Sequence, residues 1–204
     1  MNKISKNALI IMTKNPVLGQ CKTRLAATIG DEKALEIYTQ LLDYTAEFSK
    51  DIGVDRFIYS TGKVIDKQRW EDENTYFRTQ VGNDLGDKMH NAIQEIFQEG
   101  YDKIVLIGSD CTEINSADIH AAFQQLNKHK ITLGPALDGG YYLIGMKETN
   151  PTLFQNIPWS TSSVIKETFA KIKAEKLSCF LLEEKSDIDV ESDLQRKGFV
   201  EFKL

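Results

Sequence analysis

An acidic side chain follows a buried-type strand in the middle of the chain. Residues 104–107 (Ile-Val-Leu-Ile) form an apolar run that ends at Gly108, and Asp110 comes two residues later. Such a run is typical of a central strand in a parallel sheet, and ligands bind beyond the carboxyl ends of these strands. The carboxylate of Asp110 therefore either binds a metal or ligand, or caps the next helix. Because Asn115 is better placed to cap that helix, we predict metal or ligand contact for Asp110.

A basic loop that contains glycine follows the first predicted strand. Gly19, Lys22 and Arg24 all fall in the segment 14–25. The backbone N–H groups of such a loop can bind anionic oxygens, and an arginine can hold a phosphate through two hydrogen bonds. The spacing is neither that of a P-loop nor that of a G-x-G-x-x-G dinucleotide fingerprint, which disfavours a nicotinamide-dependent dehydrogenase. The segment is either a phosphate-binding loop or a solvated basic loop.

Two further acidic residues stand beside glycines. Asp84 lies in the segment 80–89, where it can cap the helix that follows. Asp138 precedes Gly139 and Gly140, and two glycines permit a positive φ or a close approach of the backbone to a ligand. For the segment around Asp84, a simple helix cap is the preferred interpretation. For the segment around Asp138, a plain hairpin turn would explain the glycines equally well.

A pair of aspartates lies near the end of the sequence. Asp187 and Asp189 are alternate residues, so on an extended segment their side chains face the same side. Like carboxylates about 4 Å apart repel each other by roughly 1–4 kcal/mol unless a cation lies between them. Oxygen ligands of this kind suit Mg²⁺ or Mn²⁺. The alternative is a solvated acidic turn in which Asp193 starts a final helix.

Hydrophobic periodicity predicts an alternation of strands and helices that positions these residues. The expected strands are 8–13, 54–60, 76–81, 103–108, 131–134, a strand fed by the turn 138–145, and 177–182; the expected helices are 31–50, 64–70, 84–99, 117–127 and 163–173. The alternation breaks after the strand 131–134, where the glycine turn must return the chain beside its predecessor. We therefore predict a three-layer α/β/α fold with a mostly parallel sheet and an antiparallel element, in one domain over residues 1–204.

Composition excludes several classes of protein. The 204 residues carry a net charge of −5, which gives no overall electrostatic footprint for nucleic acid. No apolar run approaches the length of a membrane span or a signal peptide. Cys21, Cys111 and Cys179 form neither a metal-binding pair nor a disulfide framework, so we expect a cytoplasmic protein. Cys111 is interpreted as a small buried side chain. No Ser/His/Asp triad is recognisable.

The segments together resemble a known family. The strings Lys-x-Pro-x-x-Gly-x-x-Lys-Thr-Arg-Leu, Asp-Leu-Gly, Gly-Ser-Asp-Cys, Asp-Gly-Gly-Tyr-Tyr-Leu-Ile-Gly, Pro-Trp-Ser-Thr and the terminal Asp-x-Asp occur in that order between residue 8 and about residue 195. They resemble small bacterial proteins of the nucleotide-diphospho-sugar transferase (GT-A-like) superfamily. These proteins are labelled as glycosyltransferases associated with radical-SAM and selenium-related genes, and they are similar to the phospholactate and phosphoenolpyruvate guanylyltransferases. One departure is Thr112, which stands where the family pattern usually has proline.

The resemblance implies roles for individual residues. It implies nucleotide binding by Gly19, Lys22, Thr23, Arg24, Asp84 and Ser109; catalysis by Lys22, Arg24 and Asp110; an acceptor site at Asp138, Gly139, Gly140 and Tyr141; and metal ligation by Asp110, Asp187 and Asp189. The implied function is transfer from a nucleoside triphosphate or a nucleotide sugar to a small-molecule acceptor. The expected cofactor is Mg²⁺ or Mn²⁺, and no nucleic acid or membrane partner is expected. The alternative is a nucleotide-binding sensor or scaffold protein without turnover.

Overall fold

A seven-stranded sheet organises the computed structural model, which describes residues 6–63, 66–196 and 199. The spatial order of the strands is β3-β2-β1-β4-β6-β5-β7. Their bounds are β1 Asn7–Thr13, β2 Asp55–Ser60, β3 Thr75–Thr79, β4 Lys103–Ile107, β5 Ile131–Pro135, β6 Tyr141–Met146 and β7 Cys179–Leu181. All pairings are parallel except those of β6, which runs antiparallel to both β4 and β5. The predicted mostly parallel sheet with an antiparallel element is therefore confirmed.

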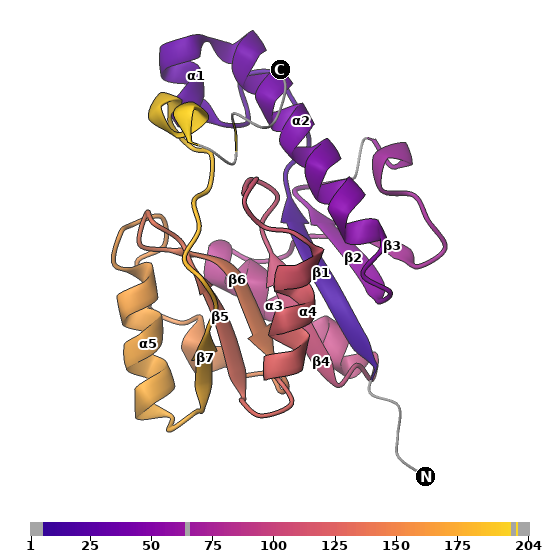
Figure 1. The fold of residues 1–204 in the computed structure, drawn as a ribbon, viewed down its shortest axis with the longest axis vertical. Coiled ribbons are helices and arrows are strands. Elements are labelled where there is room, and N and C mark those ends of the chain that lie inside the picture. Colours follow the sequence, from indigo (N-terminus) through magenta and orange to yellow (C-terminus); the bar gives the residue numbers. More distant parts are fainter. Residues whose placement is uncertain (1–5, 64–65, 197–198, 200–204) are drawn as a thin grey trace.

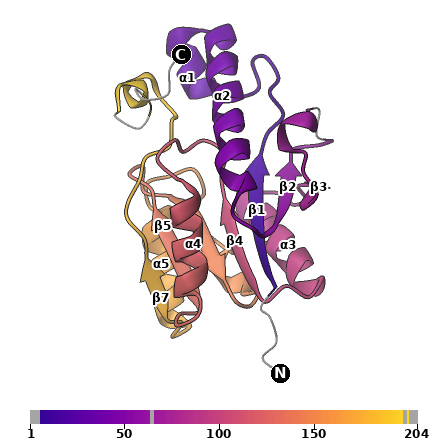
Figure 2. The same ribbon diagram turned by 45° about the vertical axis from the view of Figure 1, so that its right-hand side comes forward.

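Helices cover both faces of this sheet (Figures 1 and 2). They are α1 Thr23–Ile29, α2 Asp31–Lys50, α3 Leu85–Gln98, α4 Ser116–Gln125 and α5 Val164–Ala174, with short 3₁₀ helices η1 Gln68–Trp70, η2 Pro151–Leu153 and η3 Glu191–Gln195. Residues from α2 and α4 share one hydrophobic core with one face of the strands, and residues from α3 and α5 share a second core with the other face. The result is the expected three-layer α/β/α arrangement.

The alternation of side chains along the central strands explains the two cores. In β1, Leu9 and Ile11 pack on the side of α2, whereas Ile10 and Met12 pack on the side of α3. Every one of these side chains is buried. A strand that is apolar on both faces must lie inside a sheet that is covered on both faces, as the uninterrupted apolar runs predicted.

The sheet changes direction between β1 and β4. From β1 the chain crosses to β2 on one side, and β4 later returns to pair with β1 on the other side. The carboxyl ends of β1 and β4 thus border a topological switch point, where open α/β sheets form their ligand crevices. Asp110, which follows β4, and the loop that follows Thr13 both lie at this edge of the sheet.

Two segments differ from the sequence-based prediction. The predicted loop 14–25 runs into a helix, α1, which begins at Thr23. In the predicted short helix 64–70, residues 64 and 65 lie outside the described part of the chain, and Gln68–Trp70 form a 3₁₀ helix. The helix α1 is only seven residues long, so it shows too few turns for an apolar stripe to be read from the sequence.

Arg56 links several elements at the far end of β2. Its side chain is 1% exposed. The guanidinium donates hydrogen bonds to the backbone oxygens of Ala46 and Trp70, each at 3.0 Å, and it forms an ion pair with Asp72. A buried arginine is tolerated because these partners satisfy its two terminal nitrogens, whereas its Nε has no partner among the described residues.

Candidate active site

A cavity of about 420 Å³ opens at the carboxyl ends of β1 and β4. Its lining contains both charged and apolar side chains. We refer to its charged part as Lys14, Lys22, Arg24, Asp110, Asp138, Asp187 and Asp189, and to its apolar part as Met12, Leu85, Met89, Leu106, Tyr141, Trp159 and Val164. The volume lies in the range of small-molecule sites.

Lys22 and Asp110 form an ion pair on the floor of the charged part. The ammonium Nζ of Lys22 lies 2.9 Å from Oδ2 of Asp110, and the side chain of Lys22 is only 6% exposed. Lys22 precedes α1 in a left-handed conformation, with φ 48° and ψ 45°, which is unusual for a residue with a Cβ and is often found at functional sites. Burial is the largest influence and lowers the pKa of Lys22. The attraction and the hydrogen bond of Asp110, together with the charges of Asp187 and Asp189, raise that pKa above its ordinary value.

A second ion pair lies at the rim of the cavity. Nη1 of Arg24, in the first turn of α1, lies 2.7 Å from Oδ2 of Asp189, with side-chain exposures of 64% and 35%. The helix α1 also packs against η3, near the end of the described chain. The two residues predicted to bind phosphate are thus each paired with a carboxylate that was predicted to bind metal.

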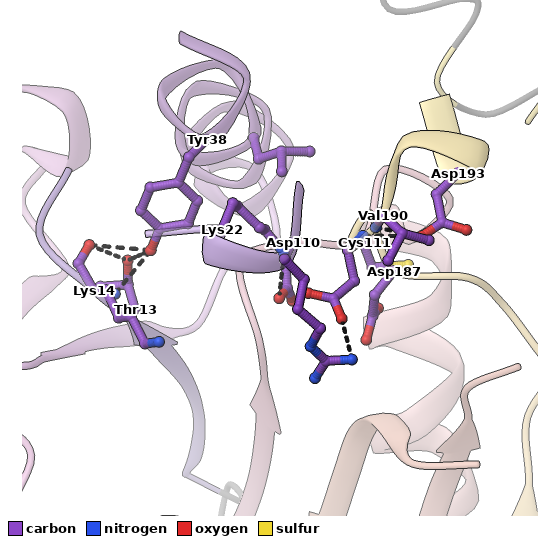
Figure 3. A network of polar contacts seen from close by, with 12 residues as sticks. Thr13, Lys14, Lys22, Tyr38, Asp110, Cys111, Asp187, Val190 and Asp193 are labelled. Atoms are coloured by element: carbon purple, nitrogen blue, oxygen red, sulfur yellow. Dashed lines mark hydrogen bonds and ion pairs between the residues drawn. The ribbon is translucent and has the colours of Figure 1, made fainter. Parts of the chain in front are cut away.

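The segment that carries Asp187 and Asp189 is fixed directly to the end of β4. The backbone N–H of Ile188 donates to the carbonyl oxygen of Asp110 at 2.9 Å, and the side chain of Ile188 is buried in the core. This backbone contact brings Asp187 beside Asp110. The backbone N–H groups of Asp189 and Val190 both donate to Asp193, each at 3.0 Å, and Figure 3 shows this turn.

Asp187 is half-buried, and its side chain is incompletely paired. Its Oδ1 atom has no hydrogen-bond partner among the described residues. Burial, followed by the nearby charge of Asp110, raises the pKa of Asp187 to about 8. The thiol of the neighbouring Cys111 donates to the carbonyl oxygen of Ser186 at 3.4 Å. Burial raises the pKa of Cys111, which keeps it a neutral thiol and agrees with its interpretation as a buried side chain.

The acidic residues fit a divalent cation in part. Asp110 and Asp187 lie close enough for their charges to interact, and the unpartnered Oδ1 of Asp187 is an atom that a cation would satisfy. Asp189 instead turns its carboxylate to Arg24. In the described part of the chain, no group of three or more His, Cys, Asp or Glu residues is arranged to hold a metal ion. The metal-binding role of the three aspartates stays a prediction.

Tyr38 holds the beginning of the basic loop. Its hydroxyl lies 3.2 Å from Oγ1 of Thr13, accepts a hydrogen bond from the backbone N–H of Lys14 at 2.8 Å, and lies 3.1 Å from the carbonyl oxygen of Lys14. Figure 3 shows these contacts. Tyr38 belongs to α2 and is buried, so it joins that helix to the point where β1 ends. Sequence reasoning missed this role, because Tyr38 reads as part of the apolar stripe of the helix.

The turn 138–140 forms the opposite rim. Oδ1 of Asp138 accepts a hydrogen bond from the backbone N–H of Gly140 at 2.8 Å. Gly139 has φ 88°, and a Cβ at this position would lie 2.2 Å from the carbonyl oxygen of Ser162. Only glycine fits there, so the turn is tied to the segment before α5.

An aromatic corner closes the apolar part of the cavity. The rings of Tyr141 and Trp159 meet edge to face with their centroids 6.3 Å apart, and the hydroxyl of Tyr141 lies 3.9 Å from the sulfur of Met89. Trp159 lies in the Pro-Trp-Ser-Thr string, which the sequence analysis noted without giving it a role. Its pairing with Tyr141 is a tertiary contact that no local pattern reveals.

Most of the predicted site residues meet at this cavity. Those that line it are Lys22, Thr23, Arg24, Ser109, Asp110, Asp138, Gly140, Tyr141, Asp187 and Asp189. Gly19, Asp84 and Gly139 are not among the lining residues. Asp84 caps α3, since its Oδ1 accepts from the backbone N–H of Asp87 at 2.8 Å, as the simpler interpretation proposed. Binding roles for all of these residues stay predictions.

The family follows from a comparison with protein-family models. The model described as "Uncharacterized protein conserved in bacteria (DUF2064)" matches residues 45–161, which include α3, β4 and the turn 138–140. The chain belongs to the DUF2064 family. A search of curated protein sequences found no match.

Solved structures place this DUF2064 member in the nucleotide-diphospho-sugar transferase-like fold. A protein from Desulfovibrio desulfuricans G20, described as a nucleotide-diphospho-sugar transferase, is 27% identical with a TM-score of 0.85, over 97% of this chain and 94% of that one. A cytidylyltransferase from Leptospira borgpetersenii is 15% identical with a TM-score of 0.58, over 91% and 79%. Rv0371c from Mycobacterium tuberculosis H37Rv, solved with manganese, is 13% identical with a TM-score of 0.57, over 97% and 99%. The last two likenesses concern the fold alone.

Among the residues that the structure describes, no helix combines the length and the apolar character that crossing a membrane requires.

Proposed function

We propose that this DUF2064 protein is a divalent-metal-dependent transferase. Its donor would be a nucleoside triphosphate or a nucleotide sugar, and its acceptor a small molecule. The observation that carries the proposal is the meeting of Lys22 and Arg24 with Asp110, Asp187 and Asp189 in one cavity at the carboxyl edge of the sheet. A site with both cations and carboxylates can hold both parts of a metal–phosphate complex.

The described likenesses support this class of reaction. The protein from Desulfovibrio desulfuricans is described as a nucleotide-diphospho-sugar transferase, and the Leptospira protein is a cytidylyltransferase. A nucleotide as one substrate is therefore the coarse conclusion. Between the two transfer reactions we favour nucleotidyl transfer. The two cations Lys22 and Arg24 suit the larger negative charge of a nucleoside triphosphate.

Each part of the site has a defined task in nucleotidyl transfer. Asp110 and Asp187 would hold the divalent cation, which neutralises charge on the phosphate oxygens. Lys22 and Arg24 would bind the oxygens of the leaving pyrophosphate. The acceptor would rest between the turn at Asp138 and the aromatic corner, and its phosphate or carboxylate would attack the α-phosphorus while the bond to pyrophosphate breaks. The apolar wall would limit the access of competing water.

Gln80 supplies a candidate contact for the base. Its Nε2 group donates to the carbonyl oxygens of Thr13 and Tyr59, at 2.8 Å and 2.9 Å. Both N–H bonds are therefore used by the backbone, and the side-chain oxygen is the atom left for a ligand. Since Gln80 lines the cavity, that oxygen would accept a hydrogen bond from an N–H group on a nucleobase edge.

The proposal is tested by binding first and by turnover second. The four nucleoside triphosphates and common nucleotide sugars are screened by thermal shift with and without Mg²⁺, and hits are assayed with an acceptor panel. Release of pyrophosphate identifies nucleotidyl transfer, and release of a nucleoside diphosphate identifies glycosyl transfer. Asp110→Asn should abolish metal-dependent nucleotide binding. A folded Asp110→Asn variant that binds the metal–nucleotide complex as the parent does would refute the proposal.

A nucleotide-binding protein without turnover is the second candidate. It is favoured by the end of β4, which carries one carboxylate, and by Thr112, whose buried Oγ1 has no partner among the described residues. Metal-dependent nucleotide binding without release of either product across the acceptor panel would decide for this candidate.

A further inference from the structure

Two of the cations that line the cavity are each neutralised by a carboxylate. Lys22 is paired with Asp110 at 2.9 Å, and Arg24 is paired with Asp189 at 2.7 Å. In the proposed function, Lys22 and Arg24 bind phosphate and Asp110 binds metal, and the family resemblance implies metal binding by Asp189 as well. Both cations that the phosphates need are therefore already paired with carboxylates, and one oxygen of the metal ligand Asp110 is already paired with a cation.

A divalent cation that arrives alone meets an occupied position. The ammonium of Lys22 is 6% exposed and lies against Asp110, and its charge is also attracted by Asp187 and Asp189. Lys22 thus stands where a cation would be most stable. A metal ion must either displace this ammonium into a less favourable place or bind beside a positive charge that repels it.

A triphosphate that arrives alone meets the reverse difficulty. Lys22 and Arg24 are already neutralised, and the carboxylates of Asp110 and Asp189 repel the phosphate oxygens. Freeing one cation for the phosphate would leave its carboxylate unpaired in a partly buried site, which is costly.

We propose that metal and triphosphate enter by an exchange of ion pairs. The metal takes the carboxylates while the phosphates take Lys22 and Arg24, so no charge is left without a partner. This inference rests on the proposed function and adds to it that the cation and the triphosphate bind with strong positive coupling. Lys22 takes the place of the metal until both arrive. By linkage, each ligand raises the affinity of the other by the same factor.

Lys14 provides a matched control for charge alone. It lines the same cavity as Lys22, but among the described residues its ammonium is in no ion pair. Removing either lysine changes the net charge of the cavity equally. Only removal of Lys22 vacates the position beside Asp110.

The first experiment measures Mn²⁺ binding without any nucleotide, by calorimetry and by the free-Mn²⁺ signal in electron paramagnetic resonance. We expect K22M to bind Mn²⁺ at least about tenfold more tightly than the parent, and K14M to bind it less than about threefold more tightly. K22M/D110N should lose the gain. Equal affinities of K22M and the parent, or an equal gain in K14M, would overturn the exchange.

The second experiment is the reciprocal measurement with inorganic triphosphate in metal-free buffer. D110N releases Lys22 and should bind triphosphate at least about tenfold more tightly. D138N removes a carboxylate of the same cavity that has no cation partner among the described residues, and it should change the affinity less than about threefold. A gain in D138N as large as that in D110N would show a general charge effect and refute the exchange.

Two precautions keep the outcome decisive. If K22M is unstable without metal, K22Q replaces it, and the rise in melting temperature caused by Mn²⁺ is compared with that of the parent. A larger rise in the variant supports the exchange, and an equal rise opposes it. Neither experiment needs an acceptor: a protein that shows the exchange without turnover fails the proposed function alone, and an active transferase without the exchange fails this inference alone.

Discussion

The hydroxyl of Tyr38 lies 2.8 Å from the backbone nitrogen of Lys14. This contact ties α2 to the residue at which β1 ends and the basic loop begins. Tyr38 also contacts the carbonyl oxygen of Lys14 and Oγ1 of Thr13. One buried hydroxyl therefore fixes the start of the segment that leads to Lys22.

We expect Tyr38→Phe to weaken binding of triphosphate in the presence of Mg²⁺ several-fold. The substitution leaves the backbone N–H of Lys14 without this partner, which costs about 1 kcal/mol of stability, and it loosens the loop that leads to Lys22. Tyr44→Phe is the control, because Tyr44 donates from the same helix to the carbonyl oxygen of Ile114 at 2.7 Å. Unlike Tyr38, Tyr44 does not line the cavity. Calorimetric titration of both variants should show a loss of affinity for Tyr38→Phe alone. Similar affinities would limit Tyr38 to a structural role.

Lys22→Ala and Arg24→Ala should discriminate between phosphate chain lengths. If both side chains bind the leaving phosphates, each variant loses charge-assisted hydrogen bonds worth about 1.5–3 kcal/mol to a triphosphate. In the presence of Mg²⁺, we expect the affinity for a nucleoside triphosphate to fall at least about tenfold, and that for the monophosphate to fall much less. Isothermal titration of the same nucleoside in both forms provides the measurement. Equal losses would remove the role of these residues in holding the outer phosphates.

The stability of the protein should fall as the pH rises through the range set by Asp187. Burial and Asp110 raise the pKa of Asp187 from 3.8 to about 8, so between these values the folded protein keeps a proton that the unfolded chain releases. Stability from this group is fully present below pH about 4 and is lost towards pH about 8, with a slope of up to about 1.4 kcal/mol per pH unit.

Asp187→Asn isolates this effect, because the other titrating groups stay the same. We expect urea denaturation in metal-free buffer at several pH values to give a parent that loses stability relative to the variant as the pH rises from 5 to 8. If the free energy of unfolding depends on pH in the same way in both proteins, Asp187 does not hold this proton.

Arg56→Met should destabilise the fold without changing the site. The substitution leaves Asp72 and the backbone oxygens of Ala46 and Trp70 without their donor. Because Asp72 is 30% exposed, water can solvate it, and the loss comes mainly from the backbone acceptors, roughly 3 kcal/mol in all. For a chain of this size the melting temperature should fall by roughly 10 °C. Arg69→Met is the comparison at a less buried arginine of the same region, with 10% side-chain exposure, and we expect a smaller loss. A fall of less than 2 °C in Arg56→Met would contradict this account.

The sequence was sufficient for the parts of the fold that depend on burial. The apolar runs of β1 and β4 identified a sheet covered on both faces, and Asp110 was located correctly at the end of a central strand. The end of the strand before Gly108 and the helix cap at Asn115 follow from local sequence patterns, and both predictions were correct. The capping box of Asn115 and Asp118 is present.

Other features could not be read from local patterns. The helix α1 is preceded by Lys22 in a left-handed conformation, which no property of a lysine side chain predicts. The position of Asp187 depends on the contact between Ile188 and the end of β4, and contacts over such a distance in sequence follow from the whole fold. The pairing of predicted phosphate ligands with predicted metal ligands also needed coordinates, since sequence analysis assigned each residue separately.

The hydrogen bond from Ile188 to Asp110 has a consequence for the order of assembly during translation. All the strands from β1 to β6 are synthesised before residues 183–193 leave the ribosome. A nascent chain can therefore build most of its sheet before Asp189, the ion-pair partner of Arg24, has left the ribosome. Completion of the charged pocket becomes one of the last steps of synthesis, and premature termination near residue 183 would yield a nearly whole sheet with an unfinished pocket.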